Sequence, residues 1–428
     1  MPNSPSEAPD LRVEVLGLAM YSAFQPILSA SHARIVGYEA LLRADDSSGT
    51  QLHPPEIFAH LETQLSQSRI HDACAQVHLA NFALEEHPGW LFLNVSPAAM
   101  GDRQGVIDDF GRLLRLSGIE PHRIVVEIIE TKVHDERLLA EAVAGFRELG
   151  CLVAIDDFGA GESNFERIWR LRPDLVKIDR AMIAEAEESA IVRRILPGLV
   201  SLLHEAGCLV VVEGIETAKQ ALIALGSDVD FVQGYFFARP VAMGAGTGPI
   251  YPNSTQVREQ FDGLIQALKH GADEREAIDL DFFQCFTSGF ETCLAAMEDG
   301  IPFFDACSTF LAVAGVQRVY LLDELGYQVG TNAESNRGLE VDPRLLPCAD
   351  ATGSNWYRRS YFQAAIKSPG KVHISRPYLS VRDAQSCVTM SIAFENREGV
   401  RVLCADLDHD PAEPISERSP RDSRILRR

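Results

Sequence analysis

Between about residues 20 and 240, short apolar runs alternate with longer stretches in which apolar side chains recur every three or four positions. The short runs have the length of buried strands, and the longer stretches have the periodicity of helices that pack on one face. This alternation is typical of repeated βα units. The predicted strands are Ala23–Leu28, Ile35–Leu42, Trp90–Val95, Arg123–Ile129, Leu152–Asp156, Leu175–Ile178, Leu209–Val212 and Phe231–Tyr235.

Helical patterns separate most of these strands. Arg137–Leu149 carries its apolar residues on one side, and Ile191–Ala206 is followed by Gly207, a residue common just after the last helical turn. Eight strands with intervening helices in about 230 residues match the size of a (β/α)₈ barrel. We therefore expect an α/β fold with a TIM-like barrel at residues 15–245, followed by a glycine-rich linker at Met243–Pro249.

The pattern changes beyond residue 250. Two helical stretches, Val257–His270 and Phe282–Glu298, come first, and alternating apolar and polar positions then predict strands. Such alternation favours an antiparallel sheet, so we expect a smaller α+β domain at residues 250–410 and a disordered tail at residues 411–428. The expected strands are Arg318–Leu322, Val372–Ser375, Thr389–Phe394 and Arg401–Leu407.

The composition is that of a globular protein, with 46% hydrophobic and 23% charged residues in a chain of 428. Lys and Arg number 39 against 61 Asp and Glu, which gives a formal net charge of -22. Duplex nucleic acid attracts basic surfaces, so it is not an expected partner. An anionic ligand would need metal ions or a local cationic pocket.

The cysteines and the apolar runs bear on the cellular compartment. The nine cysteines are widely spaced and include no CxxC pair, which predicts reduced thiols and neither a zinc site nor a disulfide framework. The first residues, MPNSPSEAPD, lack the basic and apolar layout of a signal peptide. Apolar runs such as Leu152–Ile155 are far too short to span a bilayer. We expect a cytoplasmic protein with no membrane span.

Polar side chains stand at or next to the carboxyl ends of the predicted barrel strands. In a (β/α)₈ barrel these ends converge on one face, which is where the active sites of this fold lie. Carboxylates gathered there would raise one another's pKa unless cations neutralised them. The residues are Glu39, Asn94, Glu127, Glu130, Asp156, Asp157, Lys177, Asp179, Glu213, Glu216 and Gln233.

Bound divalent metals are the expected source of that neutralisation. Carboxylates and an amide, without His or Cys, suit Mg²⁺ or Mn²⁺ better than Zn²⁺. Two such ions about 3.5–4 Å apart are a common device for hydrolysing phosphodiesters, and Lys177 would hold the attacking water or a phosphate oxygen. A single Glu at a strand end is more often a solvated residue or a helix cap, but seven successive polar strand ends favour a joint site.

These residues stand in motifs that resemble the EAL family of c-di-GMP phosphodiesterases. One Glu-Ala-Leu triplet is not specific, whereas eight motifs in the family's order, over about residues 15–242, are highly specific. The motifs are FQPI at 24–27, EALLR at 39–43, NVS at 94–96, EIIE at 127–130, DDFG at 156–159, KID at 177–179, EGIE at 213–216 and QGY at 233–235.

The resemblance implies hydrolysis of c-di-GMP to linear pGpG by a water attack assisted by two metal ions, Mg²⁺ or Mn²⁺, in a protein that forms homodimers. The implied metal ligands are Glu39, Asn94, Glu127 and Asp156 for one ion and Asp157 and Glu213 for the other, with Asp156 shared. The implied catalytic residues are Glu39, Asp157, Lys177 and Glu213. The implied substrate contacts are Gln25, Leu41, Arg43, Gln233 and Pro240, and Glu130 would stabilise the loop after the Asp pair.

The chain departs from the family in two places. Ala160, Glu162 and Asn164 stand where the family more often has Thr, Tyr and Ser, in a loop that couples metal binding to dimerisation, and Ala44 replaces a frequent aromatic residue. Two alternatives to an active enzyme of this kind stay open. One is a catalytically silent c-di-GMP receptor that signals through its C-terminal domain, and the other is a different phosphodiester or sugar-phosphate enzyme on the same fold.

The C-terminal region resembles PAS/Cache-type sensor modules, similar to the module that follows the EAL domain in YkuI-like proteins. Val319–Asp323, Arg376–Leu379 and Val402–Asp406 carry this resemblance, which implies a sensor that regulates the barrel. Its effector is not specified, because Ser354 stands where amino-acid-binding members have Arg. Either a pocket for a small ligand or ordinary core packing would account for Trp356, Tyr357, Tyr378 and Asp406.

Overall fold

A computed structural model of the protein describes residues 12–83, 89–95, 103–129, 136–160, 165–242, 254–335, 351–380, 386–396 and 399–408. The chain forms two compact units, Met1–Lys269 and His270–Arg428. The division falls within the 45-residue helix α9 (Ser254–Glu298). The predicted linker at 243–249 and the tail at 411–428 lie outside the described residues.

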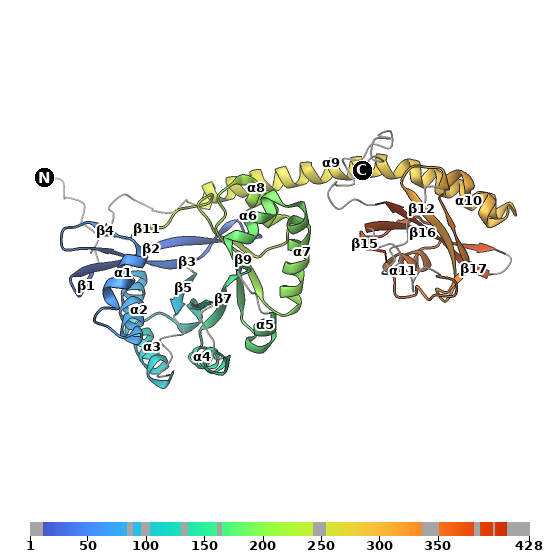
Figure 1. Ribbon diagram of the computed structural model, residues 1–428. Coiled ribbons are helices and arrows are strands. Elements are labelled where there is room, and N and C mark those ends of the chain that lie inside the picture. The colour runs from blue at the N-terminus through green and yellow to red at the C-terminus, as the bar shows by residue number, and fades with distance from the viewer. Residues whose placement is uncertain are drawn as a thin grey trace. The chain divides into compact units, whose positions relative to one another are not determined.

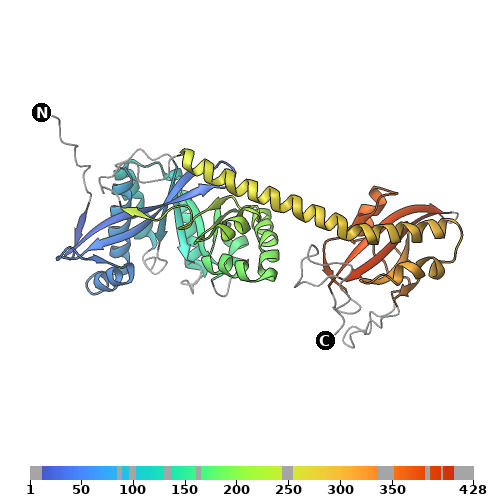
Figure 2. The same ribbon diagram turned by 90° about the horizontal axis from the view of Figure 1, so that it is seen from above.

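Eight strands of the first unit close into a barrel (Figures 1 and 2). The order around it is β2-β10-β9-β8-β7-β6-β5-β3, and β3 pairs again with β2. The pairs from β3 through β5 to β10 are parallel, whereas β2 is antiparallel to both of its neighbours. The strands are β2 (Leu18–Ser29), β3 (Arg34–Asp45), β5 (Trp90–Val95), β6 (Ile124–Ile129), β7 (Leu152–Phe158), β8 (Leu175–Ile178), β9 (Leu209–Val212) and β10 (Phe231–Val232).

The direction of β2 corrects the expectation of a uniform series of βα units. Only residues 30–33 connect β2 to β3, and the Ala33 N–H donates to Ser29 O in a tight turn. Parallel neighbours need a crossover of about a dozen residues or more, so this short link can only make a hairpin. The last barrel strand is also shorter than predicted, because β10 ends at Val232 and Gln233 lies in the loop beyond it.

Helices cover the outside of the barrel (Figures 1 and 2). Three of them begin at side-chain caps: Asp179 accepts from the Ala181 N–H, Ser189 from the Val192 N–H, and Thr217 forms a capping box with Gln220. Their apolar faces join the outward side chains of the strands in one large core. The helices are α2 (Gln67–Ala83), α3 (Arg103–Ser117), α4 (Glu136–Glu148), α5 (Phe165–Leu171), α6 (Arg180–Glu188), α7 (Ala190–Glu205) and α8 (Ala218–Leu225), with a 3₁₀ turn at Pro121–Arg123.

Strands β2 and β3 continue past the barrel as a two-stranded ribbon. Their register runs on to the pair Ala19 and Asp45, whereas β3 pairs with β5 only from Gly37 to Glu39. Helix α1 (Pro54–Leu61) covers one face of the ribbon. Three short strands join β2 and β3: β1 (Val13–Val15), β4 (Gln51–Leu52) and β11 (Val241–Ala242).

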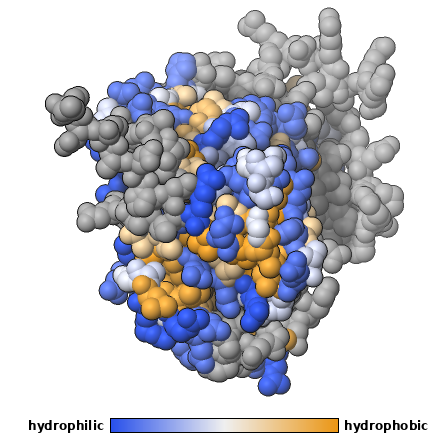
Figure 3. Space-filling model, turned by 90° about the vertical axis from the view of Figure 1, so that its left-hand side faces the viewer, coloured by the Kyte–Doolittle hydropathy of each residue, from blue (hydrophilic) through white to orange (hydrophobic). Residues whose placement is uncertain are grey.

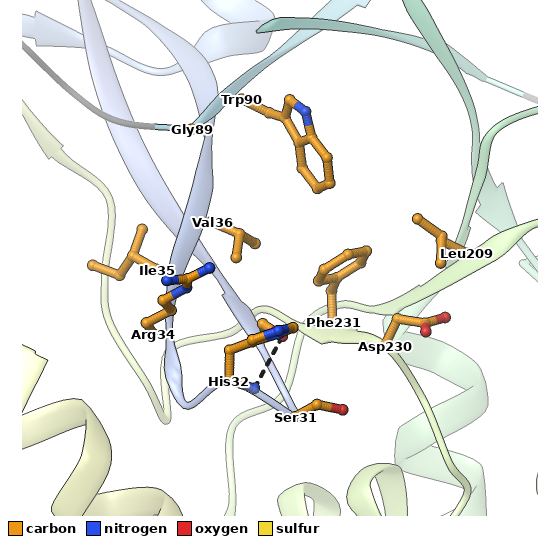
Figure 4. A pocket seen from close by; sticks show the side chains of 11 residues that line it. Ser31, His32, Arg34, Ile35, Val36, Gly89, Trp90, Leu209, Asp230 and Phe231 are labelled. Carbon is orange, nitrogen blue, oxygen red and sulfur yellow. Dashed lines mark hydrogen bonds between the residues drawn. The ribbon is translucent and has the colours of Figure 1, made fainter.

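A pocket of about 570 Å³ opens at the amino-terminal mouth of the barrel (Figure 4). Its lining includes Trp90, Leu209 and Phe231, the first residues of β5, β9 and β10, and Ser29, the last residue of the antiparallel β2. The Trp90 and Phe231 rings meet edge to face, with centroids 5.7 Å apart. This mouth is opposite the carboxyl ends of the strands, where catalysis takes place in barrels of this kind.

The second unit is built on one antiparallel sheet of order β13-β12-β17-β16-β14, with β15 also paired to β16. The two predicted helices before it are one continuous helix, α9. Helices α10 (Phe303–Leu311) and α11 (Ser360–Lys367) contribute apolar side chains to two core clusters with the strands. The strands are β12 (Val316–Asp323), β13 (Gln328–Glu334), β14 (His373–Ile374), β15 (Tyr378–Leu379), β16 (Ser386–Asn396) and β17 (Gly399–Asp408).

The expectations about membrane spans and about the state of the cysteines can be compared with the described residues. No helix among them is both long and apolar enough to cross a membrane. On the face shown in Figure 3, hydrophilic residues surround smaller hydrophobic areas, a mixture that is usual for protein surface in water. The seven cysteines for which the structure gives a state are all free, and six of them are buried.

Candidate active site

The alternation of side chains in the barrel strands builds the site above an apolar floor. The floor is a cluster of inward side chains that includes Phe92, Val125 and Leu175. Because strand side chains alternate, the residue two positions further along each parallel strand also points inward, one layer higher. That next layer consists of Asn94, Glu127, Asp156, Lys177, Glu213 and Gln233, and Gln25 takes the same level on the antiparallel β2.

Lys177 is at the centre of this layer and is fully buried. Its Nζ lies 2.7 Å from Glu127 Oε1, 2.9 Å from Glu213 Oε2, 3.2 Å from Asp156 Oδ1 and 3.7 Å from Glu39 Oε2. One ammonium group therefore faces four carboxylates in a region that is largely closed to water. A buried charge needs such partners, since desolvation alone would cost several kcal/mol per ion.

The protonation of these groups follows from burial and from their mutual charges. Burial raises the pKa of Glu127 well above its ordinary value, against the lowering effect of Lys177. Burial likewise raises the pKa of Glu213 to about 7, with Asp156 and Glu39 adding to the effect. Burial would lower the pKa of Lys177, but the four carboxylates, Asp156 first, raise it well above its ordinary value. The lysine is therefore charged, and the carboxylates are in excess over it.

Glu39 is held by two amides. Gln233 Nε2 donates to Glu39 Oε2 at 2.6 Å, and Asn94 Nδ2 donates to Glu39 Oε1 at 3.2 Å. Gln233 Nε2 also reaches Gln25 Oε1 at 3.2 Å, and Gln25 Nε2 donates to Ala238 O at 3.1 Å. These bonds fix the Glu39 carboxylate and join the first two strands to the last loop of the barrel.

Asp156 and Asp157 both reach the site although they are consecutive. The pairing of β7 with β8 shifts between Ile155 and Phe158, and Asp157 has a φ of 58°, in the left-handed region. A regular strand would send the two side chains to opposite faces, and this bulge turns the second one back. As a result, one ligand atom each from Asp156, Asp157 and Glu213 lie within 4.8 Å of one another.

The donor set fits divalent metal ions. Both oxygens of Glu127 and Oδ1 of Asp156 are buried and have no hydrogen bond of acceptable geometry with the described residues, and the same holds for Gln233 Oε1. Buried oxygens of this kind retain lone pairs that a cation can use. The ligands are carboxylate and amide oxygens, which suit Mg²⁺ or Mn²⁺.

Comparison with known proteins places this geometry in a family. The sequence matches the EAL domain over residues 10–240. The chain belongs to the EAL domain family. The strand-end residues just described therefore belong to an EAL domain.

Several curated proteins share this EAL domain. The chain is 28% identical over 227 residues to the probable cyclic di-GMP phosphodiesterase PdeN of Escherichia coli, covering 52% of this chain and 44% of PdeN. It is 28% identical over 224 residues to the cyclic di-GMP phosphodiesterase RocR of Pseudomonas aeruginosa, covering 51% of this chain and 56% of RocR. The chain thus spans about half the length of these curated relatives.

One solved structure is similar over both units. It is the Bacillus subtilis YkuI protein, with an EAL domain, in complex with substrate c-di-GMP and calcium. The two chains are 22% identical with a TM-score of 0.73, and the similarity covers 91% of this chain and 96% of YkuI. At this identity, the similarity shows the fold.

The other predicted residues of the EAL domain lie around the mouth. Leu41 and Arg43 follow Glu39 at two-residue steps on the ribbon, so they share its face, and Arg43 stands roughly 13 Å along the strand from Glu39. Pro240 is half-buried, near Ala238, which accepts the bond from Gln25. Ala44 faces the other way and is fully buried under the ribbon, so it does not share the face of Arg43. Glu130, Ser96, Glu162 and Asn164 lie outside the described residues.

Two glycines support the site in a way that the sequence motifs did not reveal. A Cβ on Gly234 would lie 2.1 Å from Ile215 O, so the loop carrying Gln233 can pass the loop carrying Glu213 only as glycine. Gly214 has a φ of 66°, and a Cβ there would lie 2.2 Å from Arg180 Cβ. Both glycines directly follow a site residue in the sequence, and this position was the signal that could have identified them as supporting residues.

Proposed function

We propose that this chain is a c-di-GMP phosphodiesterase that hydrolyses one phosphodiester bond of the ring and releases linear pGpG. The observation that carries this proposal is the set of Asp156, Asp157 and Glu213, whose oxygens lie within 4.8 Å of one another beside the buried Lys177. The names of PdeN and RocR, members of the same family, support the same substrate.

Two divalent cations, Mg²⁺ or Mn²⁺, are part of the proposal. With Glu39 and Asp157 added to the layer, five carboxylates and one ammonium group leave four formal negative charges in the site, the charge that two such ions neutralise. Glu39, Asn94, Glu127 and Asp156 would hold one ion, and Asp157 and Glu213 the other, with Asp156 shared. When bound, these ions would activate water and stabilise the charge that develops on the phosphodiester.

The protein's own groups would orient the reactants. Lys177 keeps its proton, so it would donate a hydrogen bond to the attacking water or to a phosphate oxygen. Gln233 and Asn94 hold the Glu39 carboxylate in one orientation through the bonds at 2.6 and 3.2 Å. Positioning of this kind removes freedom that the reaction would otherwise have to lose in its transition state.

The substrate would lie across the mouth of the barrel. Arg43 would meet a phosphate and Leu41 a base or sugar along the ribbon wall, while Gln25 and Pro240 stand where a guanine would bind. Water adds to phosphorus as the bond to the 3′ oxygen breaks, which leaves pGpG with a 5′ phosphate. A proton from the water passes to the opened 3′ oxygen, so the step is balanced.

The domain roles are proposed in the same way. We assign residues 15–245 to the EAL phosphodiesterase barrel and residues 250–410 to a PAS/Cache-like sensor that regulates it, in a protein that forms homodimers. The antiparallel sheet of the second unit is what a sensor of that type requires. Light scattering on the purified full chain measures the oligomeric state, and a monomer at working concentration would contradict the homodimer.

A turnover assay tests the proposed activity. Purified full-length protein with c-di-GMP and Mg²⁺ or Mn²⁺ should produce pGpG, followed by chromatography, and a chelator should stop it. Glu39→Ala should lower turnover at least about a hundredfold. The variant loses a metal ligand, and a bound metal contributes several kcal/mol by stabilising charge in the transition state. Glu205→Ala, at an exposed position on α7, is the matched control and should keep full activity.

The competing function has a distinct signature. A catalytically silent receptor would bind c-di-GMP, measured by calorimetry, yet give no pGpG with any metal tested. That result would overturn the proposed activity and leave the binding role. Turnover that persists in Glu39→Ala, with circular dichroism unchanged, would overturn the metal assignment instead.

A further inference from the structure

The second unit contains a cavity of about 40 Å³ lined by polar and aromatic side chains, several of them buried in the fold. It lies among β12, β13, β15, β17 and the start of α11. Of the four residues for which the sequence left a pocket or core packing open, Trp356, Tyr378 and Asp406 line this cavity, whereas Tyr357 is 55% exposed and does not. The buried polar residues in its lining are Arg318, Tyr320, Gln328, Tyr361, Ser380 and Asp406.

The acidic group of this cavity is already engaged. Asp406 Oδ2 lies 3.2 Å from Arg318 Nε, and Asp406 Oδ1 accepts from Thr389 Oγ1 at 2.8 Å and from Tyr320 OH at 3.2 Å. Both side chains of the ion pair are buried, so the pair is stable only as a unit. Asp406 is therefore a poor acceptor for a ligand's ammonium group, because its oxygens serve the protein's own donors.

The second cation of the cavity is placed differently. The Arg359 guanidinium lies over two aromatic rings, 4.9 Å from the Tyr378 centroid and 5.8 Å from the Trp356 centroid. Among the described residues, none accepts a hydrogen bond from this guanidinium and none forms an ion pair with it. These cation–π contacts do not use the N–H groups as hydrogen-bond donors, so the donors of the guanidinium edge are available to a ligand. Among the described residues of the lining, two arginines and one aspartate give a formal charge of +1.

We infer that this cavity is a binding site for a small monocarboxylate, held by the N–H edge of Arg359 against the rings of Trp356 and Tyr378. A carboxylate matches a guanidinium edge through two parallel hydrogen bonds and neutralises the excess charge. A zwitterionic amino acid fits less well, since Asp406 is engaged. This inference concerns binding to the second unit and does not depend on the proposed phosphodiesterase activity.

The size of the cavity limits the ligand. One water-sized group needs about 10–15 Å³ of such space, so 40 Å³ holds about three of them. Acetate, with a methyl group and a carboxylate that share a single bond, has about that size, and propionate needs only a slight opening. For a ligand of four non-hydrogen atoms, a Kd between about 0.1 and 10 mM is expected.

Titration of the full-length protein with sodium acetate, followed by calorimetry and by saturation-transfer NMR, tests this site. We expect saturable binding, loss of at least about tenfold in affinity in Arg359→Gln, and a smaller loss in Arg359→Lys, which keeps the charge but not the planar edge. Arg358→Gln is the matched control, because Arg358 is the exposed neighbour in the chain and does not line the cavity. Its affinity should equal that of the natural protein.

Four outcomes would overturn the inference. Two concern the ligand and the arginine: no saturable binding of acetate or propionate up to about 50 mM, five times the upper limit of the expected Kd, or unchanged affinity in Arg359→Gln. The third is an equal response to sodium chloride, which would indicate general anion binding. The fourth is tighter binding of glycine or alanine than of acetate, which would indicate an amino-acid site. Circular dichroism on each variant separates loss of the site from loss of the fold. Conversion of c-di-GMP, whether present or absent, does not affect any of these readings.

Discussion

Replacement of Lys177 by Met should destabilise the barrel strongly when no metal is bound. The lysine is fully buried, and its ammonium group lies within 3.7 Å of four carboxylates. Methionine keeps most of the side-chain volume and removes the charge, so packing is nearly preserved while the carboxylates lose their shared cation. Removal of one partner from a buried ionic group typically costs about 3–5 kcal/mol of the free energy of unfolding. For a domain of this size, that cost corresponds to a fall of roughly 6–20 °C in melting temperature.

The cost should depend on pH with a definite sign. The pKa of Lys177 is raised well above its ordinary value, so its contribution is complete below about pH 10. Glu213 has a pKa of about 7 in the folded protein, above its unfolded value, so its destabilising effect grows as pH rises toward 7. Without the lysine this pKa would move higher, because a lowering influence is lost. The difference between the two proteins should therefore be larger at pH 8 than at pH 5.

Differential scanning calorimetry of the full chain measures this effect on the transition of the barrel. The protein is treated with a chelator and scanned at pH 5 and pH 8, with and without Mn²⁺. Manganese should reduce the loss by at least about half, since bound cations replace the missing positive charge. Lys219→Met, at an exposed position on α8, should change stability by no more than about 0.5 kcal/mol. Equal melting of Lys177→Met and the natural protein at pH 8 without metal would refute the reasoning.

Three further predictions concern the backbone and the metals. Gly234→Ala should lower the melting temperature of the barrel, because the added Cβ would lie 2.1 Å from Ile215 O. Gly198→Ala is the control: a Cβ there has nothing within 4 Å, so the change should be neutral or stabilising by up to about 1 kcal/mol. Similar melting temperatures for the two variants would contradict this prediction. Affinity for Mn²⁺, measured by calorimetry, should rise from pH 6 to pH 8 as Glu213 loses its proton near pH 7, and a constant affinity would exclude it as a ligand. Asp157→Gly should be about 1 kcal/mol more stable than Asp157→Ala in urea denaturation, because only glycine adopts a φ of 58° without cost, whereas both should lose turnover; equal stability would contradict the left-handed backbone.

Much of the barrel could be predicted because local pattern and tertiary position agree in its strands. Val125 and Leu175 are apolar floor residues, and the polar residue two positions on falls at the same height in each strand. A period of two, read with the order of the strands, is enough to place those side chains on one face. The direction of β2 was missed although the signal was present, since residues 30–33 are too few for a parallel crossover.

Helix α9, within which the two units divide, shows a limit of a different kind. Val257–His270 and Phe282–Glu298 were predicted as two helical stretches. The structure has one helix through both, since helix needs no regular apolar face where polar residues with good helical propensity continue the chain.

Asp157 shows why the site was easier to recognise than to derive. Two consecutive aspartates on a strand predict one inward and one outward carboxylate, and nothing in the two residues themselves announces a bulge. The structure turns Asp157 inward by shifting the register of β7 and by placing a non-glycine residue at a φ of 58°. Glycine would hold that backbone at less cost, so the local fold alone does not favour aspartate there. The local backbone therefore gives no reason for aspartate at this position, whereas the site does, because a carboxylate oxygen of Asp157 lies within 4.8 Å of those of Asp156 and Glu213.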